Sequence, residues 1–279
     1  MDDFAIGLMV RFAAPERESL RRVRDMGLRY CQLTAPTDDY LYGEAGKRNT
    51  RALQEALAEF GVGVTSLFLS FPDQDWNNWR ETVGLVPVAT RACRMARACR
   101  AADWGMELGI RQVASHIGAI PKPGTPEFDP FIRDLRPFVR LLGSNGQLLA
   151  YETGQESALT LQRAMEAVGE QNQAVNFDPA NLLIYNQDAP ADFLDLLGDR
   201  VVHVHCKDGR RPESEKSLGT ETRLGEGDVD FPRLFATLYR RGYRGPLTIE
   251  REIPPGEELD RDTRNAVDYL RKLIEAEGK

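Results

Sequence analysis

Eight short apolar runs alternate with eight amphipathic stretches along this chain of 279 residues. The apolar runs, which have the length of buried strands, lie at residues 5–10, 30–35, 64–71, 112–118, 148–152, 174–178, 201–205 and 247–250. The helix candidates between and after them lie at residues 15–27, 48–60, 80–108, 127–142, 157–169, 190–197, 230–242 and 261–276. This alternation predicts a parallel sheet, because each helix must return the chain to the same end of the sheet.

Eight such units in a chain of this length favour a closed (β/α)8 barrel, the TIM barrel, which usually takes about 250 residues. The helix candidate at 80–108 is expected to be interrupted near Pro87. There is no GxGxxG after the first strand and no GxxxxGK[ST] anywhere, so an open nucleotide-binding sheet lacks its usual marker. We therefore expect residues 1–279 to form a single α/β barrel domain.

Charge and composition exclude several classes of protein. The net charge is −7, and no long run of like charge provides the clustered cations that nucleic acid requires. No segment approaches the roughly 20 apolar residues of a membrane span, and acids stand where a signal peptide has a basic start. The four cysteines lack metal or disulfide spacing, as in a reducing compartment. The sequence predicts a cytoplasmic protein with no nucleic-acid or membrane partner.

The last four strand candidates each end on a residue that binds divalent metal well. These residues are Glu152, Asp178, His205 and Glu250. The alternate positions before them are apolar and are expected to point outwards: Leu149 and Tyr151, Val175 and Phe177, Val202 and Val204, Leu247 and Ile249. The four candidates then share the inner face at the carboxyl-terminal mouth, where barrel enzymes have their active sites. The alternative is that these residues have separate roles, as a capping Asp, a surface Glu and a core His. Because the same pattern, an apolar run ending on a metal-binding residue, occurs four times, one shared metal site is favoured.

Other residues near this mouth are candidates for contact with a substrate. His116 ends the strand at 112–118 in a position to touch a ligand. Trp76, in the long connection after the strand at 64–71, could form a pocket wall or pack at a subunit interface. Arg211 is the favoured cation in the loop after the strand at 201–205. His203 and Asn176 lie one pleat below His205 and Asp178, which predicts a buried hydrogen-bonding layer there.

The donor set itself constrains the ion. Three carboxylates and one imidazole, without thiolate, suit a single hard or borderline divalent cation. This set favours Mn²⁺, with Mg²⁺, Co²⁺ or Zn²⁺ as alternatives.

Five segments of the second half resemble the xylose-isomerase-like barrel superfamily, which contains sugar and sugar phosphate isomerases and epimerases, inosose dehydratases and endonuclease IV. The segments are YETGQES (151–157), VNFDPANL (175–182), VVHVHCKD (201–208), RLGEGDVDF (223–231) and GYRGPLTIERE (242–252). The first half is similar mainly through the SHIGA segment at 115–119. The resemblance implies that Glu152, Asp178, His205 and Glu250 hold one divalent ion.

Two features of this chain refine the resemblance. Many relatives have a substrate-contacting His three residues after the Asp of the sixth strand, whereas this chain has Asn181. Asn can bind a hydroxyl but cannot act as an acid or base near neutrality, so Asn181 is a candidate for substrate binding only. Endonuclease IV holds three zinc ions and needs about five His ligands, whereas this chain has only three histidines in total. The nuclease function is therefore excluded.

The implied chemistry is proton transfer at a carbon next to a carbonyl. A divalent ion stabilises the cis-enediolate that forms when a ketose or related hydroxy-ketone loses that proton. Glu152 and Glu250 are the candidate proton carriers. If one removes the proton and the other returns it on the opposite face of the carbon, the protein is an epimerase. If one base does both on the same face, it is an aldose–ketose isomerase. Dehydration by an inosose-dehydratase-like lyase is the alternative, and a non-catalytic sugar-binding barrel is a third. The sequence contains no recognisable phosphate-binding glycine loop, which favours an unphosphorylated carbohydrate as substrate. Similar proteins are commonly homodimers or homotetramers, so either state is possible for this chain.

Overall fold

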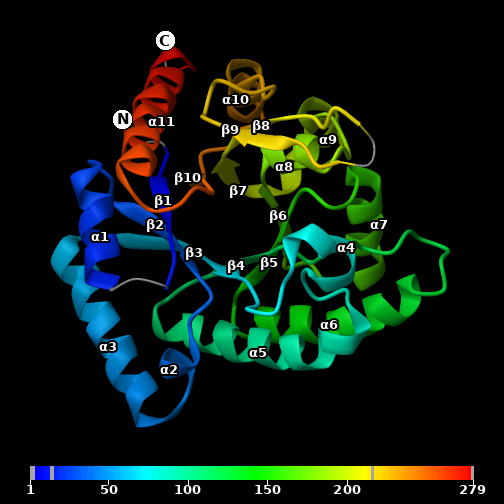
Figure 1. The fold of residues 1–279 in the computed structure, drawn as a ribbon. Helices are drawn as coiled ribbons and strands as arrows, with labels where there is room; N and C mark the ends of the chain where they lie inside the picture. The colour runs from blue at the N-terminus through cyan, green and yellow to red at the C-terminus, as the bar shows by residue number, and fades with distance from the viewer. Residues whose placement is uncertain (1–3, 13–15, 215–216, 278–279) are drawn as a thin grey trace.

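The computed structural model describes residues 4–12, 16–214 and 217–277. Eight parallel strands close into a barrel in the order β1-β10-β7-β6-β5-β4-β3-β2. Their bounds are β1 Ile6–Val10, β2 Tyr30–Thr34, β3 Gly63–Leu69, β4 Gln112–Ser115, β5 Leu148–Glu152, β6 Gln173–Phe177, β7 Val201–Cys206 and β10 Leu247–Ile249. All eight expected strands are present, and the (β/α)8 barrel is confirmed, with helices around the outside of the strands (Figure 1).

The helices follow the expected alternation, with additional short segments in the connections. They are α1 Glu16–Asp25, α2 Asp38–Leu41, α3 Gly43–Phe60, α4 Trp79–Thr82, α5 Val88–Glu107, α6 Phe128–Ser144, α7 Ala158–Val168, α8 Pro179–Ile184, α9 Pro190–Leu197, α10 Phe231–Arg240 and α11 Glu257–Glu277. The stretch at 80–108 is interrupted as expected, because Pro87 is the cap that precedes α5. Pro15, at the start of the first helix candidate, lies outside the described residues. No helix among the described residues combines the length and the apolar character that crossing a lipid bilayer requires.

The outward-facing alternates of the strands form the main core against the helices, as the sequence predicts. Tyr151 of β5 and Phe177 of β6 are completely buried there. Val202 is an exception, because it packs with the small cluster inside the barrel around Ala150. The β6–β7 register shifts at this point, pairing residue 175 with 201 and residue 176 with 203. The irregularity leaves Val202 without a partner and turns its side chain inwards; alternation alone cannot reveal such a bulge.

Inside the barrel a polar layer lies beneath the carboxyl-terminal mouth. Asn176 and His203 are both completely buried, and His203 Nε2 lies 2.7 Å from Thr248 Oγ1. The burial expected for this layer is therefore confirmed, but neither polar side-chain atom of Asn176 has a hydrogen-bond partner among the described residues. These side chains fill the interior of the barrel directly below its carboxyl-terminal end.

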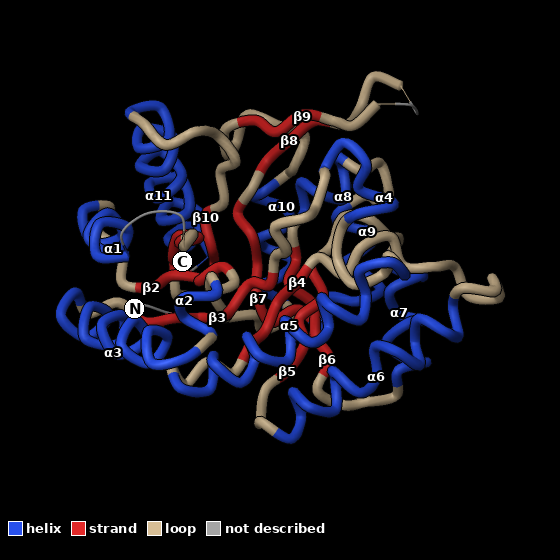
Figure 2. Tube along the Cα trace, turned by 60° about the horizontal axis from the view of Figure 1, so that its bottom comes forward, coloured by secondary structure: helices blue, strands red, loops and turns tan. Residues whose placement is uncertain are grey.

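Two long connections are built over the mouth of the barrel. The connection after β7 forms a separate antiparallel hairpin of β8 (Asp208–Arg210) and β9 (Thr220–Thr222), at the upper edge of Figure 2. The connection after β3 contains the 3-10 helix η1 (Trp76–Asn78) and α4. Buried Arg94 of α5 fastens this connection by donating to Gly84 O at 2.7 Å and pairing with Asp73 at 2.8 Å.

Candidate metal centre

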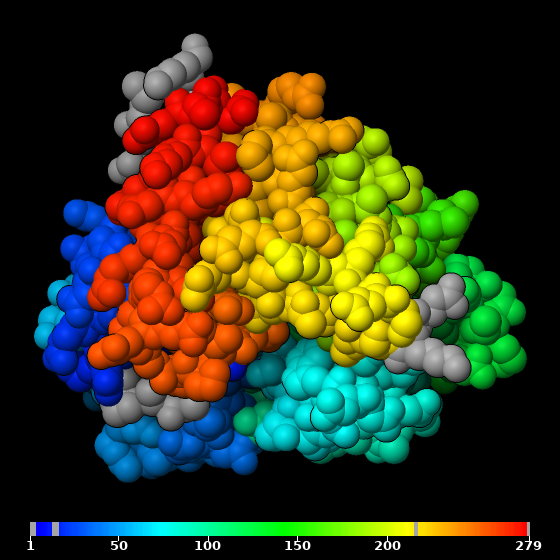
Figure 3. Space-filling model, turned by 45° about the horizontal axis from the view of Figure 1, so that its top comes forward, coloured from blue at the N-terminus to red at the C-terminus, as the bar shows by residue number. Residues whose placement is uncertain are grey.

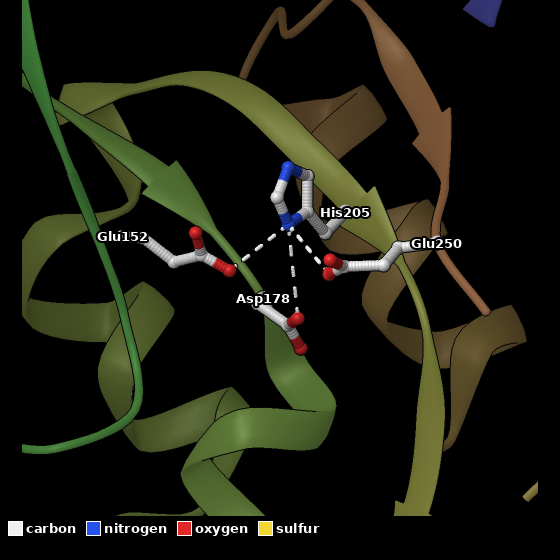
Figure 4. A group of neighbouring side chains, drawn as sticks. All are labelled: Glu152, Asp178, His205 and Glu250. Carbon is white, nitrogen blue, oxygen red and sulfur yellow. Dashed lines mark hydrogen bonds and ion pairs between the residues drawn. The ribbon is translucent and has the colours of Figure 1, made fainter. Parts of the chain in front are cut away.

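The structure brings the four predicted ligands together at the mouth of the barrel. Glu152 is the last residue of β5, Asp178 and Glu250 directly follow β6 and β10, and His205 lies near the end of β7. One potential ligand atom from each residue lies within 4.8 Å of the others, and all four side chains are buried (Figure 4). Four adjacent parallel strands ending at one level are enough to produce this convergence from residues distant in sequence.

His205 is oriented so that one ring nitrogen faces the three carboxylates. Its Nδ1 lies 3.0 Å from Glu152 Oε1, 3.1 Å from Glu250 Oε2 and 3.8 Å from Asp178 Oδ2. Its Nε2 lies 2.7 Å from Gln32 Oε1, and Gln32 donates in turn to Ser66 Oγ at 2.6 Å. Because an amide oxygen only accepts, Nε2 carries a proton and Nδ1 is the atom directed at the cluster.

Asp178 uses its two oxygens differently. Oδ1 caps α8 by accepting from the Asn181 N–H at 2.9 Å. Oδ2 has no hydrogen-bond partner within the described part of the chain and faces His205. Thr153 holds the backbone of Asp178, because its hydroxyl donates to Asp178 O and accepts from Asp178 N, both at 2.8 Å. The start of α8 thus fixes the position of a free carboxylate oxygen.

Burial and mutual proximity shift the ionisation of the cluster. Burial raises the pKa of Glu152 and that of Asp178, since a charged carboxylate loses its solvation. Burial acts in the same direction on Glu250, but Lys207 and His205 outweigh it and lower the pKa of Glu250. Burial alone would lower the pKa of His205, yet Glu152 and Glu250 raise it well above its ordinary value. A proton on His205 therefore compensates part of the negative charge of the carboxylates. A divalent cation at the same place would compensate more of it.

The residues present fit a divalent cation. Glu152 Oε2, Asp178 Oδ2 and Glu250 Oε2 are buried oxygens with no hydrogen-bond partner among the described residues. Buried carboxylates are costly unless they are paired or bind a metal. Glu152, Asp178, His205 and Glu250 together form an oxygen-rich donor set without thiolate, of the kind that Mn²⁺ and Mg²⁺ accept. The cluster could hold one such ion.

Three of the four predicted substrate-binding residues lie beside this cluster. Asn181 Nδ2 donates to Glu152 Oε1 at 3.2 Å, and His116 Nε2 lies 3.5 Å from the same oxygen. Burial lowers the pKa of His116 to about 3, so its imidazole is neutral. The Trp76 ring packs edge-on against His116 at 5.2 Å and is 43% exposed. Arg211 is directed elsewhere: its guanidinium donates to Asn186 Oδ1 at 2.9 Å and to Asp188 O at 3.1 Å.

A cavity of about 440 Å³ opens directly beside Glu250 and His116. Its walls combine aromatic rings with small polar groups: Phe12, Thr34, Thr37, Phe68, Ser70, Phe71, Gln74 and Trp76. Met9, Arg11 and Glu250 are shared with a second cavity of about 520 Å³ between β1, β10 and α11. Figure 3 shows the mouth as a hollow between the connection after β3, in cyan, and the segments after β7 and β10, in yellow and orange. A small molecule of carbohydrate size fits such a volume.

Two further residues lie at the site: Lys207, a cation of the same loop as the favoured Arg211, and Gln32, for which the sequence predicts no role. Lys207 is only 3% exposed, and its Nζ lies 2.8 Å from Glu252 Oε2 and 3.7 Å from Glu250 Oε2. A signal was present, because residues 203, 205 and 207 share one face if the strand continues past His205. Gln32 stands likewise between apolar Cys31 and Leu33 in β2, which places its amide inside the barrel.

Asp208 explains why two separate motifs of the sequence occur together. Its buried carboxylate accepts four backbone N–H groups, from Gly209 at 2.8 Å, Gly225 at 2.9 Å, Gly227 at 3.0 Å and Val229 at 3.1 Å. A Cβ at Gly227 would meet Asp208 Oδ1 at 2.1 Å, so glycine is required there. The KD of VVHVHCKD and the GEG of RLGEGDVDF are therefore two halves of one loop closure.

Comparison with known proteins agrees with this architecture. The chain is 31% identical over 169 residues to the rhizopine catabolism protein MocC of Rhizobium meliloti, covering 55% of this chain and half of that relative. It is 26% identical over 271 residues to L-ribulose-5-phosphate 3-epimerase UlaE of Escherichia coli K12, covering 94% of this chain and 90% of the relative. The crystal structure of a xylose isomerase domain protein from Planctomyces limnophilus superposes with a TM-score of 0.91 at 31% identity, over 99% of each chain. The family model described as xylose isomerase-like TIM barrel matches residues 20–273, and the chain belongs to that family.

Proposed function

We propose that this protein is a divalent-metal-dependent sugar epimerase or isomerase that acts on a ketose or a related hydroxy-ketone. The observation that carries the proposal is the buried cluster of three carboxylates and one imidazole beside a cavity of carbohydrate size. Glu152 and Glu250 approach His205 from opposite sides (Figure 4), which suits proton transfer on two faces of one carbon. The similarity to an L-ribulose-5-phosphate 3-epimerase over 94% of the chain supports the same reaction class.

In this proposal Glu152, Asp178, His205 and Glu250 hold one divalent ion, and Mn²⁺ is the ion we favour. When bound, the ion supplies Lewis-acid polarisation of the carbonyl and compensates the negative charge of the cis-enediolate. Gln32 Oε1 accepts a hydrogen bond from the Nε2–H of His205, which leaves Nδ1 as the nitrogen that faces the ion. The whole chain acts as one catalytic domain.

Glu152 and Glu250 are the proposed proton carriers. Their surroundings separate them: burial raises the pKa of Glu152, whereas Lys207 and His205 lower that of Glu250. Without a cation, the two carboxyl groups therefore differ in their tendency to hold a proton. Asn181, next to Glu152, is proposed to bind a substrate hydroxyl or carbonyl oxygen.

The remaining substrate contacts are proposed to come from the walls of the cavity. His116 is neutral and can donate or accept one hydrogen bond beside Glu152. The Trp76 ring provides an apolar face against which a sugar ring or carbon chain packs. A contact from Arg211 stays a prediction, and it would require its loop to leave Asn186 and Asp188.

Deuterium exchange tests the proposed reaction class. The purified protein is incubated with Mn²⁺ in D₂O with L-ribulose, D-psicose or D-fructose, the corresponding phosphates, or an inosose, and followed by NMR. We expect deuterium at the carbon next to the carbonyl of at least one ketose, together with its epimer or isomer. Loss of water from the inosose would instead identify a lyase, and binding without exchange would identify a carbohydrate-binding barrel. Absence of both binding and exchange across the panel would contradict the proposal.

Metal binding is expected to release protons. Without a cation, Glu152 and Glu250 raise the pKa of His205 well above its usual value, so Nδ1 carries a proton near neutrality. The ion must displace this proton, because only the neutral imidazole binds a metal. Apparent affinity for Mn²⁺ should therefore rise by at least about tenfold for each pH unit up to that pKa, because Glu152, whose pKa is also raised, must be ionised as well. Calorimetry in two buffers of different ionisation enthalpy measures the released protons, and a pH-independent affinity would contradict the assignment of His205.

A further inference from the structure

Glu252 lines the cavity beside the candidate metal centre and lies close to two cations. It follows β10 by three residues, lines the cavity and is 47% exposed through its side chain. Its Oε2 lies 2.8 Å from Lys207 Nζ, and its Oε1 lies 3.9 Å from Arg11. Its backbone N–H donates to both oxygens of Glu221 at 3.1 Å, which fixes the segment. One carboxylate is therefore the shared partner of two cations.

The cations that line the two cavities are occupied in the described part of the chain. Arg11, the cation of the smaller cavity, pairs with Glu252. In the larger cavity Arg22 pairs with Asp260 at 2.7 Å, and Arg251 pairs with Glu221 at 3.0 Å. The N-terminus of α8, beside the cluster, is already capped by the Asp178 side chain. A phosphate group would thus meet paired guanidinium groups rather than the free cations or backbone N–H groups that bind phosphate.

The wall of the smaller cavity also carries no excess of positive charge. Glu250 and Glu252 line it against the single cation Arg11, and buried Lys207 lies against both carboxylates. Two carboxylates thus balance the two cations, and a phosphate group gains no net Coulomb attraction from this wall. The aromatic walls and the hydroxyls of Thr34, Thr37 and Ser70 complement an uncharged polyol instead.

We propose that Glu252 is a specificity-determining residue that excludes anionic groups, so that this site takes an uncharged hydroxy-ketone in preference to its phosphate ester. The inference rests on the proposed function for the reaction but concerns the charge of the ligand. Glu252 acts by pairing with Lys207 and Arg11, which would otherwise attract phosphate. This pairing of opposite charges is lost when the carboxylate becomes an amide.

The test compares L-ribulose with L-ribulose 5-phosphate in the wild type and in Glu252→Gln. Binding is measured by calorimetry with and without Mn²⁺, and kcat/KM by deuterium exchange. We expect the wild type to favour the uncharged ketose, and Glu252→Gln to raise the phosphate-to-ketose ratio by about tenfold. Adding Arg11→Gln to Glu252→Gln should lower that ratio again, because it removes one of the two released cations.

Glu258→Gln is the matched control, because it removes the same charge from an exposed site on α11 that lines neither cavity. It should leave the ratio within about twofold of wild type. The inference is overturned if the wild type prefers the phosphate ester, if Glu252→Gln leaves the ratio unchanged, or if Glu258→Gln raises it equally. Failure of the proposed function is distinct: no sugar then undergoes exchange, while the ratio of binding affinities still decides the role of Glu252.

Discussion

Glu152→Gln and Glu250→Gln are each expected to reduce turnover by about a thousandfold, the effect typical of losing a positioned proton carrier. Glutamine keeps the size of the side chain and one oxygen that can face the cluster, but it cannot accept or return a proton near neutrality. Both residues belong to the buried cluster, on opposite sides of His205. The measurement is the rate of deuterium incorporation into the ketose at saturating Mn²⁺, with bound metal determined in the same samples.

Loss of the metal must be separated from loss of the proton carrier. Glu166→Gln is the matched control, since Glu166 is exposed on α7 and pairs only with Arg163 among the ion pairs of the described residues. It should leave both metal content and turnover unchanged. A variant at Glu152 or Glu250 that retains near-normal turnover would remove that residue from the pair. A variant that loses turnover only through loss of Mn²⁺ should recover when the ion concentration is raised.

Asp208→Ala is expected to destabilise the loop over the mouth by about 3–5 kcal/mol, because four backbone N–H groups lose a charged acceptor at once. The donors are on Gly209, Gly225, Gly227 and Val229. The same change should lower turnover strongly, since Lys207 immediately precedes this anchor and faces Glu250. Amide hydrogen exchange at Gly225 and Gly227, with the midpoint of thermal unfolding, measures the loss of order.

Asp228→Ala provides the comparison for Asp208→Ala. Asp228 is exposed in the same loop and accepts one bond, from the Arg211 N–H at 3.2 Å, so its loss should cost less than about 1 kcal/mol. If both variants had equal effects, the loop would not depend on the buried carboxylate. Protected amides at Gly225 and Gly227 in Asp208→Ala would lead to the same conclusion.

The barrel and its four central side chains could be predicted because they depend on local periodicity. Each of Glu152, Asp178, His205 and Glu250 ends an apolar run, and parallel strands bring such ends together whatever the connections do. The residues that could contact a substrate were harder to predict from the sequence. His116, Asn181 and Trp76 lie at the site, but Arg211 is held by Asn186 and Asp188.

What escaped prediction depends on contacts between distant segments. Lys207 is buried because Glu250 and Glu252, more than 40 positions later, compensate its charge. Val202 turns inwards because of the register shift between β6 and β7. The hairpin of β8 and β9 pairs two short polar segments with no hydrophobic alternation, so no periodic signal marks it.

The candidate metal centre and the wall of the neighbouring cavity belong to different parts of the fold. The prospective ion site is built entirely at the ends of strands, whereas Trp76 and its neighbours belong to a segment fastened through Arg94. Engineers could therefore exchange residues 72–82 between homologues as an interchangeable cassette, retaining Arg94 as the attachment point. Under the proposed function, such chimaeras would change the preference among sugars while the cluster at the strand ends stays unchanged.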